Sequence, residues 1–310
     1  MAYRVLILGN RGMLGHMVEH VLASDARFTI RGVGRDVFDA VAFPPGVISS
    51  DEREISHRTT LEQLLARTDF VINCIGVTAR HVDESDPASV ARAIRVNAEF
   101  PHVLAASAAQ RGVNVIHMST DGVFCGSSFS PSPREGEREG VGIRAYTEAD
   151  PPDATDTYGR TKLLGEGRAP NALNVRCSII GPSPYKREGL WEWVAAQPEG
   201  TTIDGYTNHI WHGVTTLQFA EFCRWIIAED RFDGLRATSH VLHFAPNVPC
   251  TKAELVTAIA EALGKRMTVR PIVHVAPIQR VLAMRSDLVT AFGTDRPIAE
   301  ALRACAAATV

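Results

Sequence analysis

The sequence of 310 residues lacks the cysteine spacing of a disulfide framework or a zinc site. Its six cysteines are scattered along the chain, and none belongs to a Cys-x-x-Cys pair. Such cysteines are typical of buried or free thiols in a reducing compartment. We therefore expect a cytoplasmic protein without disulfides, and we assign no metal site.

Long apolar runs and a one-sided charge are also missing. No stretch approaches the roughly 18 apolar residues that read as a membrane-spanning helix. The N-terminus enters the apolar run Val5–Leu8 at once, without the features of a secretion signal. Net charge is only −3, from 32 basic and 35 acidic residues, and no long basic stripe is present. We expect neither a nucleic-acid partner nor a membrane.

What the sequence does contain is an alternation of apolar strands and amphipathic helices. Short apolar runs that end at glycine or turn residues are typical of buried parallel strands. Helical patterns lie between them, the longest starting at Asp86-Pro87. The pattern predicts an α/β fold with a Rossmann-like, doubly wound parallel sheet. The runs that carry this prediction are 5–8, 29–33, 70–75, 113–118 and 173–180.

A glycine-rich turn, residues 9–15, follows the first run and precedes a helix. Strand, glycine turn and helix in this order are the context of a dinucleotide-binding site. Glycines let the backbone approach a pyrophosphate, and the new helix offers it free N–H groups. The spacing is Gly-x-x-Gly-x-x-Gly, and a tight turn without a ligand is the alternative. We favour cofactor binding by Gly9, Arg11, Gly12, Met13, Leu14 and Gly15.

The end of the second run bears on which dinucleotide is bound. An acidic residue about 20 positions after the glycines would hold a ribose hydroxyl, whereas an arginine accommodates a 2′-phosphate. Arg35 stands at this distance from Gly15 and favours NADP(H), while Asp36 leaves NAD(H) open. Asp51 is assigned to the adenine side, although a solvated loop carboxylate is nearly as good an interpretation.

The ends of the next strands should face the same cleft, because ligands of open parallel sheets lie beyond the carboxyl ends of the strands. Cys74, Ile75 and Gly76 would lie beside the cofactor, and Thr78 on the substrate wall. Asn97 falls within an apolar helical stripe and needs partners for its amide. It is either a structural bridge or an organiser of the cofactor site, and we include it among the cofactor-binding candidates.

Tyr158 and Lys162 stand four residues apart and share one face of a predicted helix. An ammonium beside the phenol, with an oxidised nicotinamide, would favour the phenolate and lower its pKa from about 10. Thr120, at the end of the fourth strand, would position a substrate oxygen against Tyr158. The pair alone is a weak signal, and the glycine turn upstream raises its weight.

The second half of the chain gathers aromatic and polar side chains, which suit a sugar or a base. Trp191 and His209 are substrate-binding candidates, with a small aromatic core as an equal interpretation of Trp191. We place the sheet domain at 1–178 and 212–242, and a smaller discontinuous α+β lobe at 179–211 and 243–310. A long loop is expected over 127–156.

The glycine turn, Thr120 and Tyr158-x-x-x-Lys162 together resemble the extended short-chain dehydrogenases. Within that superfamily, Met13-Leu14-Gly15, residues 119–124 and residues 158–166 resemble the dTDP-4-dehydrorhamnose reductase family. The resemblance covers about residues 1–180 well. Beyond them, two further family segments appear only as Asp204-Gly205-Tyr206 and Gly213-Val214-Thr215.

The resemblance implies an NADPH-dependent reductase that acts on the 4-keto group of a nucleotide-linked 6-deoxy sugar, in the synthesis of polysaccharide or glycan precursors. It implies that Tyr158 protonates the developing alkoxide, that Lys162 holds the nicotinamide ribose, and that Thr120 orients the carbonyl. Val123 and Phe124, next to Thr120, are added to the substrate wall. A homodimer is compatible with it. The family's acidic metal-binding contacts at a dimer interface cannot be placed in this sequence, so we assign no metal.

Other functions of the same fold remain open. Relatives that dehydrate follow the threonine with Asp-Glu, whereas here Asp121 and Gly122 follow it, which disfavours dehydration. A nucleotide-sugar epimerase would require an acid/base pair in the cleft. Cys125 and His209 are candidates, but the sequence does not indicate that they form a pair. A non-catalytic NADP-binding subunit, similar to the regulatory subunit of methionine adenosyltransferase, would keep the cofactor site alone.

Overall fold

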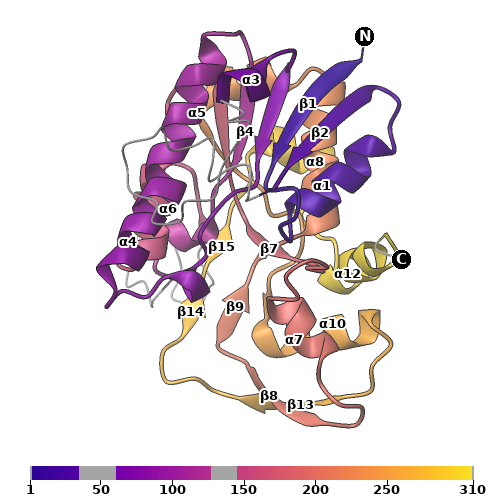
Figure 1. Ribbon diagram of the computed structural model, residues 1–310. Helices are drawn as coiled ribbons and strands as arrows, with labels where there is room; N and C mark the ends of the chain where they lie inside the picture. The colour runs from indigo at the N-terminus through magenta and orange to yellow at the C-terminus, as the bar shows by residue number, and fades with distance from the viewer. Residues whose placement is uncertain (1, 35–60, 127–144, 309–310) are drawn as a thin grey trace, which may run out of the picture.

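The computed structural model describes residues 2–34, 61–126 and 145–308. At its centre is a parallel sheet of six strands in the order β2-β1-β3-β4-β6-β11 (Figure 1). The chain runs from β1 to β2 and then returns to the other side of β1 to add β3, so the strand order reverses between β1 and β3. Such a switch point is where open α/β sheets bind ligands. The predicted doubly wound α/β fold is confirmed. The sheet strands are β1 (Tyr3–Leu8), β2 (Phe28–Val33), β3 (Phe70–Asn73), β4 (Asn114–Met118), β6 (Ala172–Arg176) and β11 (Val241–His243).

Helices cover both faces of the sheet. Alternate residues of a strand point to opposite faces, and β1 follows this rule: Val5 and Ile7 join one core cluster, Leu6 and Leu8 the other. The first cluster is closed by α1 (Gly15–Ala23) and α8 (Thr216–Ala228), with α9 (Phe232–Thr238) and α11 (Ser286–Phe292) beside them. On the other face lie α3 (Leu61–Leu65) and α5 (Phe100–Ala109).

The predicted helix at Asp86-Pro87 consists of three segments, α4 (Pro87–Ala93), a π-helical turn η2 (Ile94–Glu99) and α5. Asp86 caps it, because its carboxylate accepts a hydrogen bond from the backbone N–H of Ala88 at 2.9 Å. π-Helical turns inside α-helices are frequent at functional sites. This one holds the buried Asn97.

The predicted run 173–180 is two strands in the structure, β6 and β7 (Ser178–Ile180). β6 stays in the sheet, whereas β7 leaves it and pairs with β10 (Gly213–Thr215). A Cβ atom at Gly213 would collide with the carbonyl of Ser178, so this pairing requires glycine there. The apolar pattern continues through the break, and therefore the sequence did not indicate it.

The lobe lies beyond the carboxyl ends of the sheet strands (Figure 1). Its core contains Trp191, Trp211, Leu255 and Ile259, which α12 covers with Leu302. A capping box formed by Thr251 and Glu254 starts the central helix of the lobe. The lobe elements are α7 (Leu190–Ala195), β8 (Thr202–Tyr206), β9 (His209–Trp211), β12 (Cys250–Thr251), α10 (Lys252–Ala262), β13 (Thr268–Ile272), β14 (Ile278–Gln279) and α12 (Ile298–Ala307).

The boundaries at 178, 211 and 242 remain a prediction. Within the range assigned to the lobe, Leu288 of α11 packs in the core of the sheet. The remaining elements are η1 (Ala79–His81), η3 (Asp121–Val123), β5 (Ala145–Tyr146), α6 (Thr157–Leu164) and β15 (Val281–Leu282). Among the described residues, no helix combines the length and the apolar character that a membrane crossing requires.

Candidate active site

The glycine turn brings β1 and α1 into close contact. Gly9 has a positive φ of 84°, a conformation that favours glycine. Its carbonyl accepts a hydrogen bond from the N–H of Gly12 at 2.8 Å. A Cβ atom at Gly15 would collide with that same carbonyl, so the first turn of α1 can approach β1 only with glycine there.

Backbone N–H groups remain free where an anion would lie. Among the described residues, the N–H groups of Arg11, Met13 and Leu14 have no hydrogen-bond acceptor in the protein. They precede the N-terminus of α1, whose partial positive charge attracts anions. The Arg11 side chain is exposed beside them. The turn therefore fits the pyrophosphate of a dinucleotide.

Residues 74–77, directly after β3, lie next to this turn and are called the wall below. Asn73 accepts a hydrogen bond from the N–H of Ile75 at 3.1 Å, and its amide contacts Nδ1 of the buried His117 at 3.1 Å. Asn97 accepts from the N–H of Val77 at 2.8 Å and donates to its carbonyl at 2.9 Å. Two buried asparagines thus hold the wall from both sides.

Asn97 also links the wall to helix α6. Its Nδ2 donates to Thr161 Oγ1 at 3.2 Å, so both of its donors are used inside the protein. A Cβ atom at Gly165 would collide with the Asn97 carbonyl, and glycine allows α6 to approach. Of the two interpretations of Asn97, the geometry favours the structural bridge, which positions the site.

Tyr158 and Thr120 converge at the carboxyl end of β4. A Cβ atom on Gly122 would lie 3.2 Å from both Thr120 Oγ1 and Tyr158 Cε1, so both side chains flank this glycine. Thr120 is 5% exposed and accepts a hydrogen bond from the N–H of Gly122 at 3.0 Å. Asp156 caps α6 by accepting from the N–H of Gly159 at 2.9 Å. The cap and the turn together fix the phenol beside the threonine hydroxyl.

Lys162 lies one turn further along α6 and is 3% exposed. Its ammonium donates to the carbonyl of Met118, the last residue of β4, at 2.5 Å. A Cβ atom on Gly76 would be 3.9 Å from Lys162 Nζ, which places the ammonium at the wall after β3. Burial lowers the Lys162 pKa to about 8, and Glu166 acts against this shift.

The pKa of Tyr158 differs from the sequence-based expectation. Burial raises it to about 12, hydrogen bonding with Thr120 opposes the rise, and the charge of Asp121 adds to it. We expected Lys162 to lower this pKa. That expectation included an oxidised nicotinamide, and in the protein by itself desolvation of the buried phenol is the largest cause of the shift. Tyr158 is therefore protonated at neutral pH.

Two cations that act on the buried Asp121, Lys252 and Arg280, were missed by the sequence interpretation. Burial raises the pKa of Asp121, and Arg280 and Lys252 oppose that rise. Arg280 donates to the carbonyl of Cys125 at 3.3 Å, while its Nε is buried without a partner among the described residues. Lys252 and Arg280 come from the far end of the chain, and no local motif marks them.

Most of the residues predicted to contact the substrate have buried side chains. Val123 and Phe124 are fully buried in a small cluster with Tyr146, so their side chains cannot line a cleft. Trp191 is 4% exposed in the lobe core, which favours its structural interpretation. The burial favours a structural role for these three side chains, and their substrate roles stay predictions.

Two other candidates stay at the surface. Thr78 is exposed and its hydroxyl lies 2.9 Å from Nδ1 of His81. His209 packs in a cluster with Tyr206 and His274, with ring centroids 4.8 Å from each, and its Nε2 lies 2.9 Å from the Ala276 carbonyl. Neither contacts Tyr158 in the structure, so their substrate roles stay predictions.

Some predictions lie outside the described residues. Arg35 and Asp51 are in this group, and so is most of the predicted loop 127–156. The described wall residues Cys74 and Ile75 are half-buried, and Gly76 is exposed, as cofactor contacts would require. Within the described ranges, no group of three His, Cys, Asp or Glu side chains could hold a metal ion.

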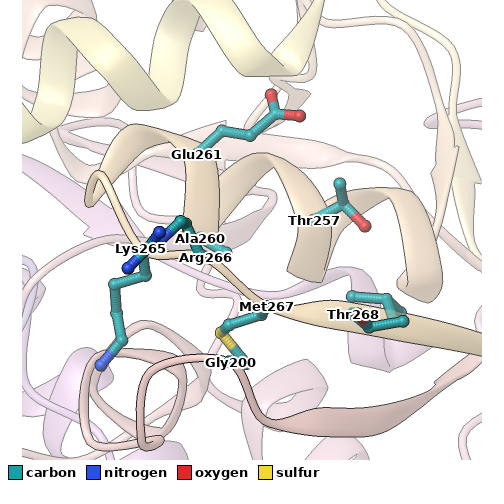
Figure 2. Close-up of a pocket in the computed structure, with 9 residues that line it drawn as sticks. Gly200, Thr257, Ala260, Glu261, Lys265, Arg266, Met267 and Thr268 are labelled. Carbon is teal, nitrogen blue, oxygen red and sulfur yellow. The ribbon is translucent and has the colours of Figure 1, made fainter.

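A separate pocket of about 320 Å³ lies in the lobe between the end of α10 and β13 (Figure 2). Lys265 points away from Glu261 there, and its ammonium donates to the carbonyls of Ala195 and Gln197 at the end of α7. Its lining includes Thr257, and all of it comes from the lobe. We assign this pocket no part in the candidate site.

Comparisons with known proteins agree with this geometry. A family model described as the RmlD substrate binding domain matches residues 3–288. A dTDP-4-dehydrorhamnose reductase of Mycobacterium tuberculosis is 32% identical over 181 residues, which cover 57% of this chain and 50% of the relative. A protein of the same name from Burkholderia thailandensis is 36% identical over 121 residues, or 38% of this chain and 35% of that protein.

A solved structure covers more of the chain at lower identity. The dTDP-4-dehydrorhamnose reductase of Bacillus anthracis, in complex with NADP, has a TM-score of 0.73 over 99% of this chain and 100% of that chain, with 17% sequence identity. Likeness at this identity concerns the fold alone. The chain spans half or less of the length of the two relatives above.

Proposed function

The chain belongs to the RmlD substrate binding domain family, and from this premise we propose that it reduces the 4-keto group of a nucleotide-linked 6-deoxy sugar with NADPH. The observation that carries the proposal is the convergence of Tyr158, Thr120 and Lys162 at the carboxyl end of β4. The relatives' names support the reaction, and the NADP complex of the Bacillus anthracis protein supports the cofactor. NAD(H) remains the second choice.

The residues of the chain would supply the proton and the positioning. Bound NADPH supplies the hydride, which is the chemistry of the cofactor. Tyr158, with its pKa raised to about 12, holds a proton that it can give to the oxygen that becomes the new hydroxyl. Thr120 would hold that oxygen against the phenol, because the bond that its hydroxyl donates to Asp121 is long, 3.3 Å. Such a general acid contributes about 100- to 10,000-fold.

The cofactor would be held by the backbone and by Lys162. The free N–H groups of the glycine turn suit the pyrophosphate, and the lysine ammonium at the wall after β3 suits the nicotinamide ribose. The cations Lys252 and Arg280, which act on Asp121, suit an anionic substrate such as a nucleotide diphosphate sugar.

Steric packing at Gly122 favours reduction over dehydration. A Cβ atom there already approaches Thr120 and Tyr158 to 3.2 Å. A glutamate at this position, as in the relatives that dehydrate, would have to displace one of them. For epimerisation, Cys125 is bound to the Asp153 carboxylate at 2.8 Å and His209 belongs to a different cluster. No acid/base pair supports that alternative among the described residues.

The test is the loss of NADPH absorbance with a panel of nucleotide-linked 4-keto-6-deoxy sugars. Turnover with one of them, and a product reduced at C4, is the expected result. Tight NADPH binding without turnover on any sugar would instead identify a non-catalytic binding subunit. Conversion of the sugar without consumption of NADPH would indicate an epimerase. The homodimer and the cytoplasmic location stay predictions.

A further inference from the structure

We propose that Glu166 is a positioning residue, which anchors α6 to the ends of β4 and β6 and keeps the ammonium of Lys162 charged. The proposal deepens the proposed function, on which it rests for the role of Lys162. Glu166 follows the last turn of α6 and is not part of the Tyr-x-x-x-Lys pair. Its contacts, burial and charge carry the argument.

The Glu166 carboxylate is buried and fully engaged. Arg176 of β6 donates to it twice, from Nε to Oε1 at 2.8 Å and from Nη2 to Oε2 at 2.7 Å. Ser119, directly after β4, donates to Oε1 at 2.5 Å. The side chains of Glu166 and Arg176 are only 4% and 5% exposed. Two-point binding of this kind restricts position as well as adding energy.

Arg176 is itself held on two further sides. Its Nη1 lies 3.4 Å from Nε2 of His243, whose Nδ1 lies 3.1 Å from the carbonyl of Tyr146. Burial, and then the charge of Arg176, lower the His243 pKa to about 3. The ring is therefore neutral, donates from Nδ1 to the carbonyl, and accepts from Arg176 at Nε2. The guanidinium also lies 5.3 Å from the centroid of the Phe124 ring.

Glu166 follows Lys162 by four residues, and the two side chains contact adjacent residues at the end of β4, Ser119 and Met118. The titratable groups that raise the lysine pKa against burial are Glu166 first, then Cys177 and Cys74. Burial raises the pKa of both thiols, that of Cys74 to about 12, so they are uncharged at neutral pH. Burial, and then the charge of Lys162, lower the pKa of His117 well below its ordinary value, so it is neutral as well.

Glu166 is thus the negative charge that opposes desolvation of Lys162. With a pKa of about 8, about half of the lysine side chains are charged at pH 8. Loss of the carboxylate charge would lower this fraction. A purely structural ion pair would be equally buried, but it would leave the titration of Lys162 unchanged.

The experiment uses the scarcity of lysine in this chain. It has four lysines, Lys162, Lys186, Lys252 and Lys265. Incorporation of lysine labelled with ¹³C at Cε therefore gives four signals, and Lys162→Arg assigns the relevant one. We expect a titration midpoint near 8 in the wild-type protein and a clearly lower midpoint in Glu166→Gln.

Ser119→Ala is the matched control, because it removes one hydrogen bond from Glu166 and keeps the charge. Its midpoint should stay near that of the wild type. If Glu166→Gln does not fold, the double variant Glu166→Gln/Arg176→Gln removes both charges, and the same lower midpoint is expected. A midpoint equal to the wild-type value in a folded variant without the carboxylate would overturn the proposal.

A second readout separates this proposal from the proposed function. NADPH fluorescence titrations at pH 6 and pH 8 should show about twofold weaker binding of the wild type at pH 8, if only charged Lys162 binds the ribose. The loss should be larger in Glu166→Gln. Failure of NADPH to bind at either pH would count against the proposed function, whereas the lysine titration would still decide the role of Glu166.

Discussion

The two ends of α6 differ in how far their polar groups are paired. At the reactive end, which we define as Tyr158 with Thr120 and Arg280, the threonine bond to Asp121 is long and Arg280 Nε has no partner among the described residues. At the anchored end, which we define as Glu166 with Ser119 and Arg176, the carboxylate accepts three short bonds.

This difference indicates that the two ends of the helix have different roles. Buried polar groups without hydrogen-bond partners lower the free energy of unfolding unless a ligand pairs with them. The anchored end, whose polar groups are paired, can hold the groups of the reactive end in position before a ligand binds. The comparison therefore predicts that changes at the reactive end affect turnover, whereas changes at the anchored end affect stability.

The largest effect is expected from Tyr158→Phe, which removes the phenolic proton and retains the ring. Turnover of the sugar that the wild type reduces should fall about 100- to 10,000-fold, with little change in the midpoint of urea unfolding. Tyr185→Phe is the control, since Tyr185 is 65% exposed. Equal turnover by Tyr158→Phe and the wild type would exclude the phenol as the proton donor.

Arg176→Met should break the anchored end. It leaves the buried Glu166 carboxylate with Ser119 alone, and unpaired buried charges of this kind cost about 3–5 kcal/mol. Urea unfolding measures the loss. Arg4→Met removes a partly exposed ion pair with Asp69 and should cost far less. If both variants lost the same stability, the distinction between the two ends would not hold.

His243→Gln sharpens the comparison through pH. The folded pKa of His243, about 3, lies below its unfolded value of about 6.5, so the unfolded state binds more protons between these values. The stability from this group is present above pH 6.5 and is lost as the pH falls. From pH 7 to pH 5 the loss is about 2 kcal/mol.

The glutamine variant keeps a side-chain acceptor for Arg176 but cannot titrate. Between pH 7 and pH 5, its free energy of unfolding should therefore fall by about 2 kcal/mol less than that of the wild type. The measurement is urea unfolding at both pH values. An identical pH dependence of the two proteins would show that His243 is not the neutral acceptor beneath Arg176.

Gly122→Ala should have the smallest effect and act at the reactive end. Its Cβ atom would press on Thr120 and Tyr158 at 3.2 Å, so one of them must move by a few tenths of an ångström. Since a 1 Å misplacement can cost about 100-fold, we expect roughly tenfold lower turnover. Gly234→Ala is the control, because no atom lies within 4 Å of its Cβ position. Unchanged turnover would mean that the pair tolerates displacement.

Much of the fold was predictable because its signals are local. The strands of the sheet are short apolar runs, and the caps at Asp86 and Thr251 precede their helices directly in sequence. The break between β6 and β7 was not predictable, because Cys177 continues the apolar run while the pairing partner changes. The short strands of the lobe pair with distant segments, as β8 does with β13, and carry little periodicity of their own.

In the candidate active site, too, local features were predictable and contacts with distant residues were not. The sequence by itself determined the glycine turn and the shared helical face of Tyr158 and Lys162, because backbone geometry and helical spacing act between neighbours in the chain. Only the tertiary structure decided that Ser119 and Arg176 meet Glu166, and that Arg280 contacts a carbonyl 155 residues away. Strand order and packing select the partners of buried charges, and neither leaves a local pattern in the sequence.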